Sequence, residues 1–415
     1  MKESTEYNEY TLSNGLRIIA KPDKSDIVYC GVAINTGSRD ELNSEFGMAH
    51  FIEHMLFKGT KKRKSAHIIN RLENVGGELN AYTSKEETIV YAGVLKEYSE
   101  RAIELLADIV LNSVFPQKEI DKEVDIILDE IQSYNDSPSE LIYDDFEEIL
   151  FDGNALAHNI LGTEDILKNF TTQHAQSFVS RQYHTNQMVL FVNGNLDFRK
   201  IIRWAEKYFR SENMAHNPLQ RIAPSDVINP YRKTIDKDTH QVHFLAGTRA
   251  YNIYHPDRLG LYLLNNIIGG PGMNSLLNMS LREKNGLVYN VESSFQPFTD
   301  SGIWTVYFGC DPENAQKCED LVKNELKKLI DRPINDNSLK KYKLQLLGQM
   351  ALASENKENQ ALSLGKSYLR YNKIDSPTGL RQKIEAITAS QLHQIANDIF
   401  QPEKMFTLIY KYYEY

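Results

Sequence analysis

Two histidines and a glutamate in the segment AHFIEHMLF, residues 49–57, have the spacing of a catalytic metal site. His50 and His54 are four residues apart, so on a helix their side chains lie on one face, with Glu53 beside them. Two imidazoles placed in this way can chelate one zinc ion, and the neighbouring carboxylate can take a proton from water. Three fixed residues in five also arise by chance, but the apolar residues around them favour a helix packed in a core over a solvated charged face. The pattern HxxEH therefore predicts a hydrolytic zinc site.

A third ligand must come from elsewhere, because catalytic zinc usually has three protein ligands and one water. The segment 116–134 is a candidate helix, with an apolar stripe formed by Ile120, Val124, Ile127, Leu128 and Ile131. Three glutamates lie along the edge of this stripe, where a carboxylate can be partly buried: Glu119, Glu123 and Glu130. Helical spacing leaves all three open as ligands, and each is also compatible with an ordinary surface glutamate.

The segments that must position these residues alternate between strand-like and helix-like patterns. The candidate helix 46–58 contains both histidines, and Pro116 marks the first turn of the helix 116–134. We expect another helix over 97–112 and strands over 16–22, 28–36, 78–84, 88–95 and 187–193. The chain therefore predicts an α+β fold with helices packed on sheets.

A stretch with three prolines near residues 211–230 divides the chain into halves of similar length. We expect a zinc-binding catalytic domain over 1–212, a linker over 213–230 and a second domain over 231–415.

The two halves also share a faint repeat. A strand, Gly37-Ser38-Arg39 and a helix in the first half match a strand, Gly247-Thr248-Arg249 and a helix in the second. His50 lies thirteen residues after Gly37 (50 − 37 = 13), where the second copy has Gly260. The repeat predicts two structurally related domains, each a mostly antiparallel β-sheet with packed helices, in which one copy carries chemistry and the other packing.

The composition excludes several classes of protein. The 47 basic and 56 acidic residues give a formal net charge of −9, which disfavours broad nucleic-acid binding. Three cysteines cannot form a disulfide framework, so we expect a reducing compartment. No apolar run approaches the roughly 20 residues of a membrane span, and the first residues resemble neither a signal peptide nor a transit peptide. We therefore expect a cytoplasmic protein without a membrane span.

Four separated motifs together resemble the pitrilysin/mitochondrial-processing-peptidase family of zinc metallopeptidases. They are GMAHFIEHMLFKGT (47–60), NAYTSKE (80–86), EVDIILDEI (123–131) and ILGTEDIL (160–167). The resemblance implies that Glu130, 76 residues beyond His54 (130 − 54 = 76), is the third ligand of one Zn²⁺ per chain. It also implies that Glu53 is the general base and that Glu123 supports the site from beside the metal ligands.

The resemblance further implies how a peptide is bound. The segment 77–81 is similar to the edge strand to which an extended substrate adds as another strand, with Asn80 and Ala81 in contact with it. Arg282 and Tyr289, on either side of Gly286, match a pair that grips the substrate and helps polarise the scissile carbonyl. Taken without the resemblance, Gly286 is simply a helix C-cap with an arginine near the helix C-terminus.

We therefore expect a zinc metalloendopeptidase that hydrolyses peptides or unstructured polypeptide segments inside a dimeric chamber. Because the zinc motif and the Arg/Tyr pair occur in one chain, the resemblance implies a homodimer. The alternative is a catalytically silent scaffold or peptide-binding subunit of the same fold. Intact His50, Glu53, His54 and Glu130 disfavour that alternative.

Overall fold

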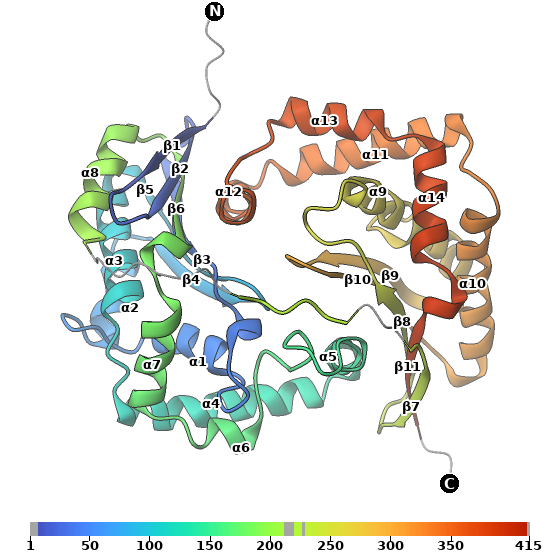
Figure 1. Cartoon of the computed structure of the whole chain (residues 1–415), viewed down its shortest axis with the longest axis horizontal. Helices are drawn as coiled ribbons and strands as arrows, with labels where there is room; N and C mark the ends of the chain where they lie inside the picture. Colours follow the sequence, from blue (N-terminus) through green and yellow to red (C-terminus); the bar gives the residue numbers. More distant parts are fainter. Residues whose placement is uncertain (1–6, 211–219, 226–228, 413–415) are drawn as a thin grey trace, which may run out of the picture. The chain divides into compact units, whose positions relative to one another are not determined.

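The computed structural model of the chain describes residues 7–210, 220–225 and 229–412 (Figure 1). The described residues form two compact units, and each unit is assembled from three separate stretches of chain. Unit 1 takes the described residues of Met1–Ile131, His158–Arg221 and Leu352–Ser376, and unit 2 takes those of Gln132–Ala157, Ile222–Ala351 and Pro377–Tyr415.

Unit 1 is built on a six-stranded sheet with the strand order β1-β2-β6-β3-β5-β4. Its strands are β1 (Asn8–Thr11), β2 (Arg17–Pro22), β3 (Ile27–Ile34), β4 (Glu78–Thr83), β5 (Thr88–Leu95) and β6 (Met188–Gly194). Its longer helices are α1 (Met48–Met55), α2 (Ser65–Glu73), α3 (Ser99–Asn112), α4 (Gln117–Asn135, whose last turn is assigned to unit 2), α7 (Thr172–Gln182), α8 (Phe198–Tyr208) and α12 (Lys357–Tyr371). Shorter helical segments are η1 (Ser38–Asp40), η2 (Lys96–Tyr98), α6 (Glu164–Leu167) and η3 (Thr185–Gln187).

Unit 2 is built on a five-stranded sheet with the order β7-β11-β8-β10-β9. Its strands are β7 (Arg232–Asp236), β8 (Val242–Arg249), β9 (Val288–Pro297), β10 (Gly302–Cys310) and β11 (Phe406–Lys411). Its helices are α5 (Pro138–Leu150), α9 (Arg258–Gly269), α10 (Ala315–Asp331), α11 (Asp336–Ala353, whose end is assigned to unit 1), α13 (Pro377–Ala386) and α14 (Ala389–Ile399). A π-helical segment, η4 (Asn278–Glu283), and the short turns η5 (Pro312–Asn314) and η6 (Pro402–Lys404) complete it.

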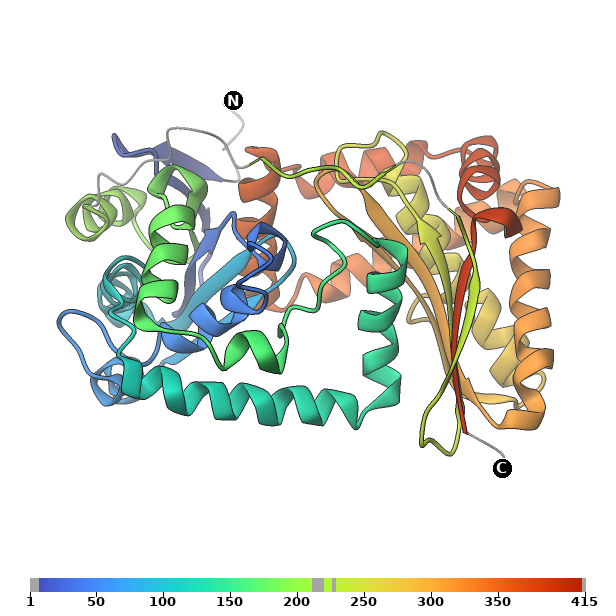
Figure 2. The same ribbon diagram turned by 60° about the horizontal axis from the view of Figure 1, so that its bottom comes forward.

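Both sheets are covered on both faces, which explains why their central strands are almost continuously apolar. In β3, Val28, Cys30 and Val32 face the core shared with α1 and α3, while Ala33 faces a second core against α12. In β8, Phe244 and Leu245 likewise belong to opposite cores. Each half of the chain therefore contributes to both units, because α12 covers the second face of the unit 1 sheet and α5 that of the unit 2 sheet (Figures 1 and 2).

The predicted α+β fold with two related domains is confirmed. The orders β2-β6-β3-β5-β4 and β7-β11-β8-β10-β9 share one pattern, a parallel pair followed by three antiparallel pairs. Helix α1 begins 11 residues after Gly37 (48 − 37), and α9 begins 11 residues after Gly247 (258 − 247). The predicted boundary stays a prediction, since much of the linker 213–230 lies outside the described residues.

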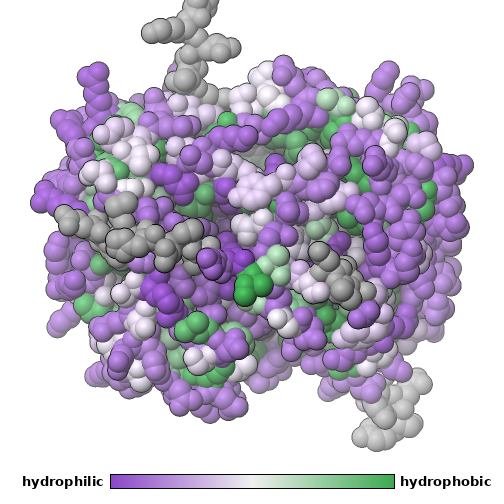
Figure 3. All heavy atoms as spheres, viewed as in Figure 1, coloured by the Kyte–Doolittle hydropathy of each residue, from purple (hydrophilic) through white to green (hydrophobic). Residues whose placement is uncertain are grey.

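The face of the molecule seen in Figure 3 is mainly polar. Figure 3 shows hydrophilic residues over most of the visible face, with hydrophobic residues scattered between them. Within the described residues, no helix combines the length and the apolar character that a membrane crossing requires.

The packing of α12 on the unit 1 sheet can be tested at a glycine. A Cβ at Gly365 would lie 2.4 Å from Cδ1 of buried Phe191, whereas a Cβ at Gly348 in α11 would meet no atom within 4 Å. We expect Gly365→Ala to lower the free energy of unfolding of unit 1 by about 1–3 kcal/mol through overpacking. The matched control Gly348→Ala should raise stability by up to about 1 kcal/mol, because alanine favours a helix interior. Equal effects of the two variants in urea unfolding would contradict this packing.

Candidate metal centre

Helices α1 and α4 bring three potential metal ligands together. One ligand atom from each of His50, His54 and Glu130 lies within 4.8 Å of the others. Nε2 of each histidine is 3.8 Å from Oε2 of Glu130. Ligands about 2.0–2.2 Å from one tetrahedral ion lie about 3.3 Å apart, so the arrangement fits a small cation such as zinc after a slight contraction. In the part of the chain that the structure describes, no other group of three His, Cys, Asp or Glu residues comes together in this way.

The start of α1 is fixed by a buried carboxylate. Glu41 accepts hydrogen bonds from the main-chain amides of Gly47 (2.9 Å) and Ala49 (2.7 Å), two amides at the N-terminus of the helix. Gly47 has φ = 96°, and a Cβ there would lie 2.6 Å from the carbonyl oxygen of Leu161, so only glycine fits. His158 Nε2 lies 2.9 Å from Oε2 of Glu41, the oxygen that also accepts from Gly47. These contacts set the position of α1, and therefore of His50 and His54.

Glu123 holds His54 in one orientation. Its Oε1 lies 2.9 Å from His54 Nδ1, and its Oε2 lies 2.6 Å from Lys58 Nζ. Burial would raise the pKa of Glu123, but the hydrogen bonds from His54 and Lys58 lower it below its usual value. An ionised Glu123 accepts a hydrogen bond from Nδ1–H and leaves the Nε2 lone pair of His54 directed towards Glu130, as in carboxylate–histidine–metal arrangements.

The two histidines titrate differently. Burial, reinforced by the charge of His54, lowers the pKa of His50 to about 3. His50 is therefore a neutral imidazole at neutral pH, the form that ligates metals. Burial would also lower the pKa of His54, but the hydrogen bond to Glu123 and nearby carboxylates raise it.

Glu53 lies beside the ligand group without belonging to it. Its carboxylate accepts a hydrogen bond from the side chain of Thr83 at the end of β4. One of its oxygens, Oε2, is buried and has no hydrogen-bond partner among the described residues. Burial raises the pKa of Glu53, which is partly opposed by Thr83 and by the charge of His54. A half-buried carboxylate with a raised pKa and one unengaged oxygen is suited to exchanging a proton.

The strand next to this site, β4, is an edge of its sheet. Leu79 and Ala81 face the core that contains α1, whereas Asn80 is exposed on the face shared with Tyr82. The amide of Ser84 donates to the carbonyl of Glu87 (2.8 Å), so this pair is hydrogen-bonded. Because hydrogen-bonded residues alternate along an antiparallel strand, the main chain of Asn80 is bonded to β5, and that of Ala81 points outward. Ala81 therefore presents its main-chain groups at the open edge, as do Leu79 and Thr83 by the same alternation.

Arg282 and Tyr289 belong to unit 2, not to the unit that carries the ligand group. The guanidinium carbon of Arg282 lies 5.8 Å from the centroid of the Tyr289 ring, and Tyr289 is 86% exposed. Gly286, with φ = 61°, closes the π-helical segment η4 through its amide, which donates to the Arg282 carbonyl (2.8 Å). The predicted glycine cap is thus present, and it places the arginine and the tyrosine together.

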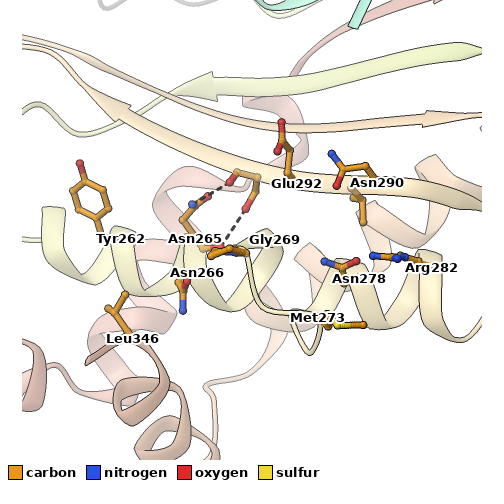
Figure 4. Close-up of a pocket in the computed structure, with 14 residues that line it drawn as sticks. Tyr262, Asn265, Asn266, Gly269, Met273, Asn278, Arg282, Asn290, Glu292 and Leu346 are labelled. Carbon is orange, nitrogen blue, oxygen red and sulfur yellow. Dashed lines mark hydrogen bonds between the residues drawn. The ribbon is translucent and has the colours of Figure 1, made fainter. Parts of the chain in front are cut away.

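Arg282 also lines a pocket of about 400 Å³ between α9, η4 and the edge strand β9 (Figure 4). Asn278 lies beside Arg282 in this pocket, whereas the side chains of Asn290 and Glu292 point to the opposite side of β9. Glu292 accepts a hydrogen bond there from Tyr143 of α5 (2.8 Å). Arg282 therefore presents a cationic side chain to the pocket.

Two residues of the site were not predicted from the sequence. Lys58 holds Glu123, and Thr83 holds Glu53. Lys58 follows His54 by four residues, as His54 follows His50, and this repeated spacing would have placed it towards α4. No local pattern indicates Thr83, because its contact depends on the packing of α1 against β4.

Comparisons with known proteins identify relatives of this chain. The family model for insulinase (peptidase family M16) matches residues 17–164, and the model for the peptidase M16 inactive domain matches residues 169–346. An uncharacterized zinc protease of Rickettsia bellii is 34% identical over 405 residues, with 96% of each chain covered. One of Bacillus subtilis is 30% identical over 401 residues, with 96% of this chain and 97% of the other covered.

Solved structures share the fold. A protease from Helicobacter pylori has a TM-score of 0.92 at 23% identity, covering 98% of this chain and 99% of the other. A peptidase M16 inactive domain from Pseudomonas fluorescens has a TM-score of 0.91 at 18% identity, covering 98% of both chains. Two family models match the chain, and relatives resemble it over nearly their whole length. The chain also has the HxxEH helix. It therefore belongs to peptidase family M16, the insulinase family.

Proposed function

We propose that the chain is a zinc-dependent endopeptidase that binds one Zn²⁺ through His50, His54 and Glu130. The observation that carries this proposal is the convergence of these three ligand atoms within 4.8 Å, with Glu53 beside them but outside the set. Relatives named zinc proteases support the choice of metal and of reaction class. The complete set of ligands and base favours an enzyme over a silent scaffold.

When bound, zinc lowers the pKa of a coordinated water towards neutrality and polarises a carbonyl group. Glu53 accepts a proton from the attacking water as its oxygen bonds to the scissile carbonyl carbon. The protonated Glu53 then donates this proton to the leaving nitrogen as the carbon–nitrogen bond breaks. Water is thereby added across the peptide bond, and Glu53 returns to its starting state. Its raised pKa favours the first transfer, in which Glu53 takes up the proton.

Glu123 acts as a positioning residue in this proposal. With Lys58 it keeps Nδ1 of His54 occupied, so that Nε2 is the atom available to the metal.

The substrate binds as an added strand on β4. The outward main-chain groups of Ala81 hydrogen-bond to an extended peptide, which brings one of its peptide bonds near Glu53 on the adjoining helix. Affinity then comes mainly from main-chain pairing, which suits unstructured segments of varied sequence. Asn80 contributes through a side chain on the exposed face of the strand.

Arg282 and Tyr289 complete the site from a partner chain in a homodimer that encloses a chamber. A cation beside a phenol can stabilise the negative charge that develops on the scissile oxygen. The pair lies in unit 2, exposed and with the cation over the ring, which is compatible with this role.

The ligand set can be tested by paired substitutions in α4. Glu130→Gln should weaken zinc retention by about 10-fold or more, because a neutral amide replaces the anionic ligand. The adjacent, exposed Asp129→Asn should leave it unchanged. Zinc content after dialysis against a weak chelator measures both. If the two variants lost zinc equally, Glu130 would not be the ligand.

The assignment of the base makes a different prediction. Glu53→Gln should lower kcat by at least about 100-fold, because the proton acceptor is lost, while the zinc content stays that of the wild type. Cleavage of an unstructured peptide and metal analysis of the same sample report the two effects. Loss of zinc in this variant would identify Glu53 as a ligand and contradict its role as base.

A shared site between chains predicts complementation. A chain with Glu53→Gln and a chain with Arg282→Ala and Tyr289→Phe should each be nearly inactive alone. In a freely exchanged mixture about half of the dimers are mixed, and each mixed dimer has one complete site of two, so activity should recover to roughly a quarter of wild type. Native mass spectrometry must show that mixed dimers formed. No recovery in their presence would mean that the pair acts within its own chain.

A further inference from the structure

The turn that follows β4 carries three consecutive charged residues that are almost completely buried. Lys85, Glu86 and Glu87 are 3%, 2% and 3% exposed. Charged side chains are rarely buried to this extent unless they are paired, because removing a charge from water costs free energy. The partners of this turn therefore show what the turn holds in place.

Glu86 is held by two arginines. Nη1 of Arg39, in η1, lies 2.6 Å from Oε1 of Glu86, and both side chains are almost fully buried. Arg221 donates to the main-chain oxygen of Glu86 (2.9 Å) and binds both carboxylate oxygens of Asp40 (2.9 and 2.8 Å). Such two-pronged pairs fix orientation as well as distance.

The two residues beside Glu86 are held from other parts of the chain. Arg370 of α12 donates to Glu87 through both Nε (3.0 Å) and Nη2, and Lys366 of the same helix lies 3.7 Å from Glu87. Lys85 donates to the main-chain oxygen of His158 (2.6 Å).

These contacts join all three stretches of chain that form unit 1. The turn itself belongs to the first stretch, His158 and Arg221 are the first and last residues of the second, and Arg370 lies in the third. Arg221 is also within the predicted linker, so the chain is pinned to the turn at the residue where it leaves unit 1.

The same turn connects the two elements of the candidate site. On one side it follows β4 directly, whose last residue, Thr83, donates to Glu53. On the other side its main chain accepts from the amides of Ser38 (3.2 Å, to Ser84) and Arg39 (2.8 Å, to Lys85). Gly37 permits this approach, since a Cβ there would lie 2.2 Å from the Ser84 oxygen. Glu41, which caps α1, follows η1 immediately.

We propose that the buried turn 85–87 positions the edge strand β4 against helix α1 and thereby sets peptide affinity, without touching peptide or metal. It does so through the contacts of Glu86 and Glu87 with three arginines: Arg39, Arg221 and Arg370. This proposal rests on the proposed peptidase function for its substrate, but its structural part does not. Arg370 is the residue to test, because it reaches the turn from a stretch of chain remote from β4 and α1 and is not in the metal or peptide site.

The central comparison is Arg370→Met with Arg370→Lys, which keeps the cation. We expect Arg370→Met to raise KM for an unstructured peptide on the order of 10-fold, with kcat within about 2-fold and zinc content unchanged. Arg370→Lys should restore most of the affinity. Arg381→Met, which removes an exposed pair with Glu385, is the matched control and should change nothing.

Hydrogen–deuterium exchange of the zinc-loaded protein supplies a measurement that needs no activity. In Arg370→Met, the amides of Arg39 and Ser84 and those of β4 and β5 should exchange faster, while those of β1 and β2 stay as in wild type. If Arg370→Met fails to fold, Glu87→Gln is tested in the same way. If Arg370→Met left both KM and exchange unchanged, the proposal would be overturned. It would also be overturned if this variant exchanged faster throughout unit 1 and lost zinc. If the wild-type chain cleaves no peptide, the peptidase proposal fails, and the exchange pattern alone decides whether the turn positions β4.

Discussion

The hydrogen bond of 2.9 Å between His54 and Glu123 is the contact on which the candidate site depends. Histidines four residues apart on α1 can face one point, but their ring orientations and the third ligand must come from α4. Glu123 meets both needs, because it selects the nitrogen of His54 that faces Glu130 and, two turns along the same helix, sets where Glu130 lies. Lys58 balances the charge of this buried carboxylate, which would otherwise be costly.

The duplicated unit shows what the same scaffold does without this chemistry. At the helical positions equivalent to His50, Glu53 and His54, helix α9 has Gly260, Leu263 and Leu264, all buried. A Cβ at Gly260 would lie 2.4 Å from Ile395, so the position is used for close helix packing. The edge strand differs as well: Asn265 donates to the carbonyl of Ser293 in β9 (3.1 Å), which occupies a group that an added strand would need. One copy thus keeps an open edge and ionisable groups, whereas the other fills the helix positions with packing contacts and occupies an edge carbonyl with a hydrogen bond.

Local periodicity predicted the helices and strands well, but it did not predict which sheets and side chains they contact. Strands β2 to β6 and helices α3 and α4 lie within a few residues of the predicted bounds, and the predicted helix 46–58 contains α1. Strand β1 (Asn8–Thr11) was not predicted. The third ligand could not be chosen by spacing, because the three glutamates of α4 share one edge and differ only in what they meet. Glu119 pairs with exposed Lys122, Glu123 with His54, and Glu130 lies opposite both histidines.

The packing of α5 on the unit 2 sheet and of α12 on the unit 1 sheet was also not predictable, because the apolar face of a helix does not indicate which sheet it covers. The buried turn 85–87 has the composition of a solvated loop, and only its distant arginines reveal that it is buried.

The central claim is that one metal ion is held by His50, His54 and Glu130, with both histidines bound through Nε2. A crystal of the zinc-loaded chain, measured on both sides of the zinc absorption edge, tests this directly. The account predicts one anomalous peak about 2.0–2.2 Å from both Nε2 atoms and from a Glu130 oxygen, with Glu53 outside bonding distance and Glu123 on Nδ1 of His54. A peak bonded to Glu53 or to a histidine Nδ1, or no peak between α1 and α4, would contradict it.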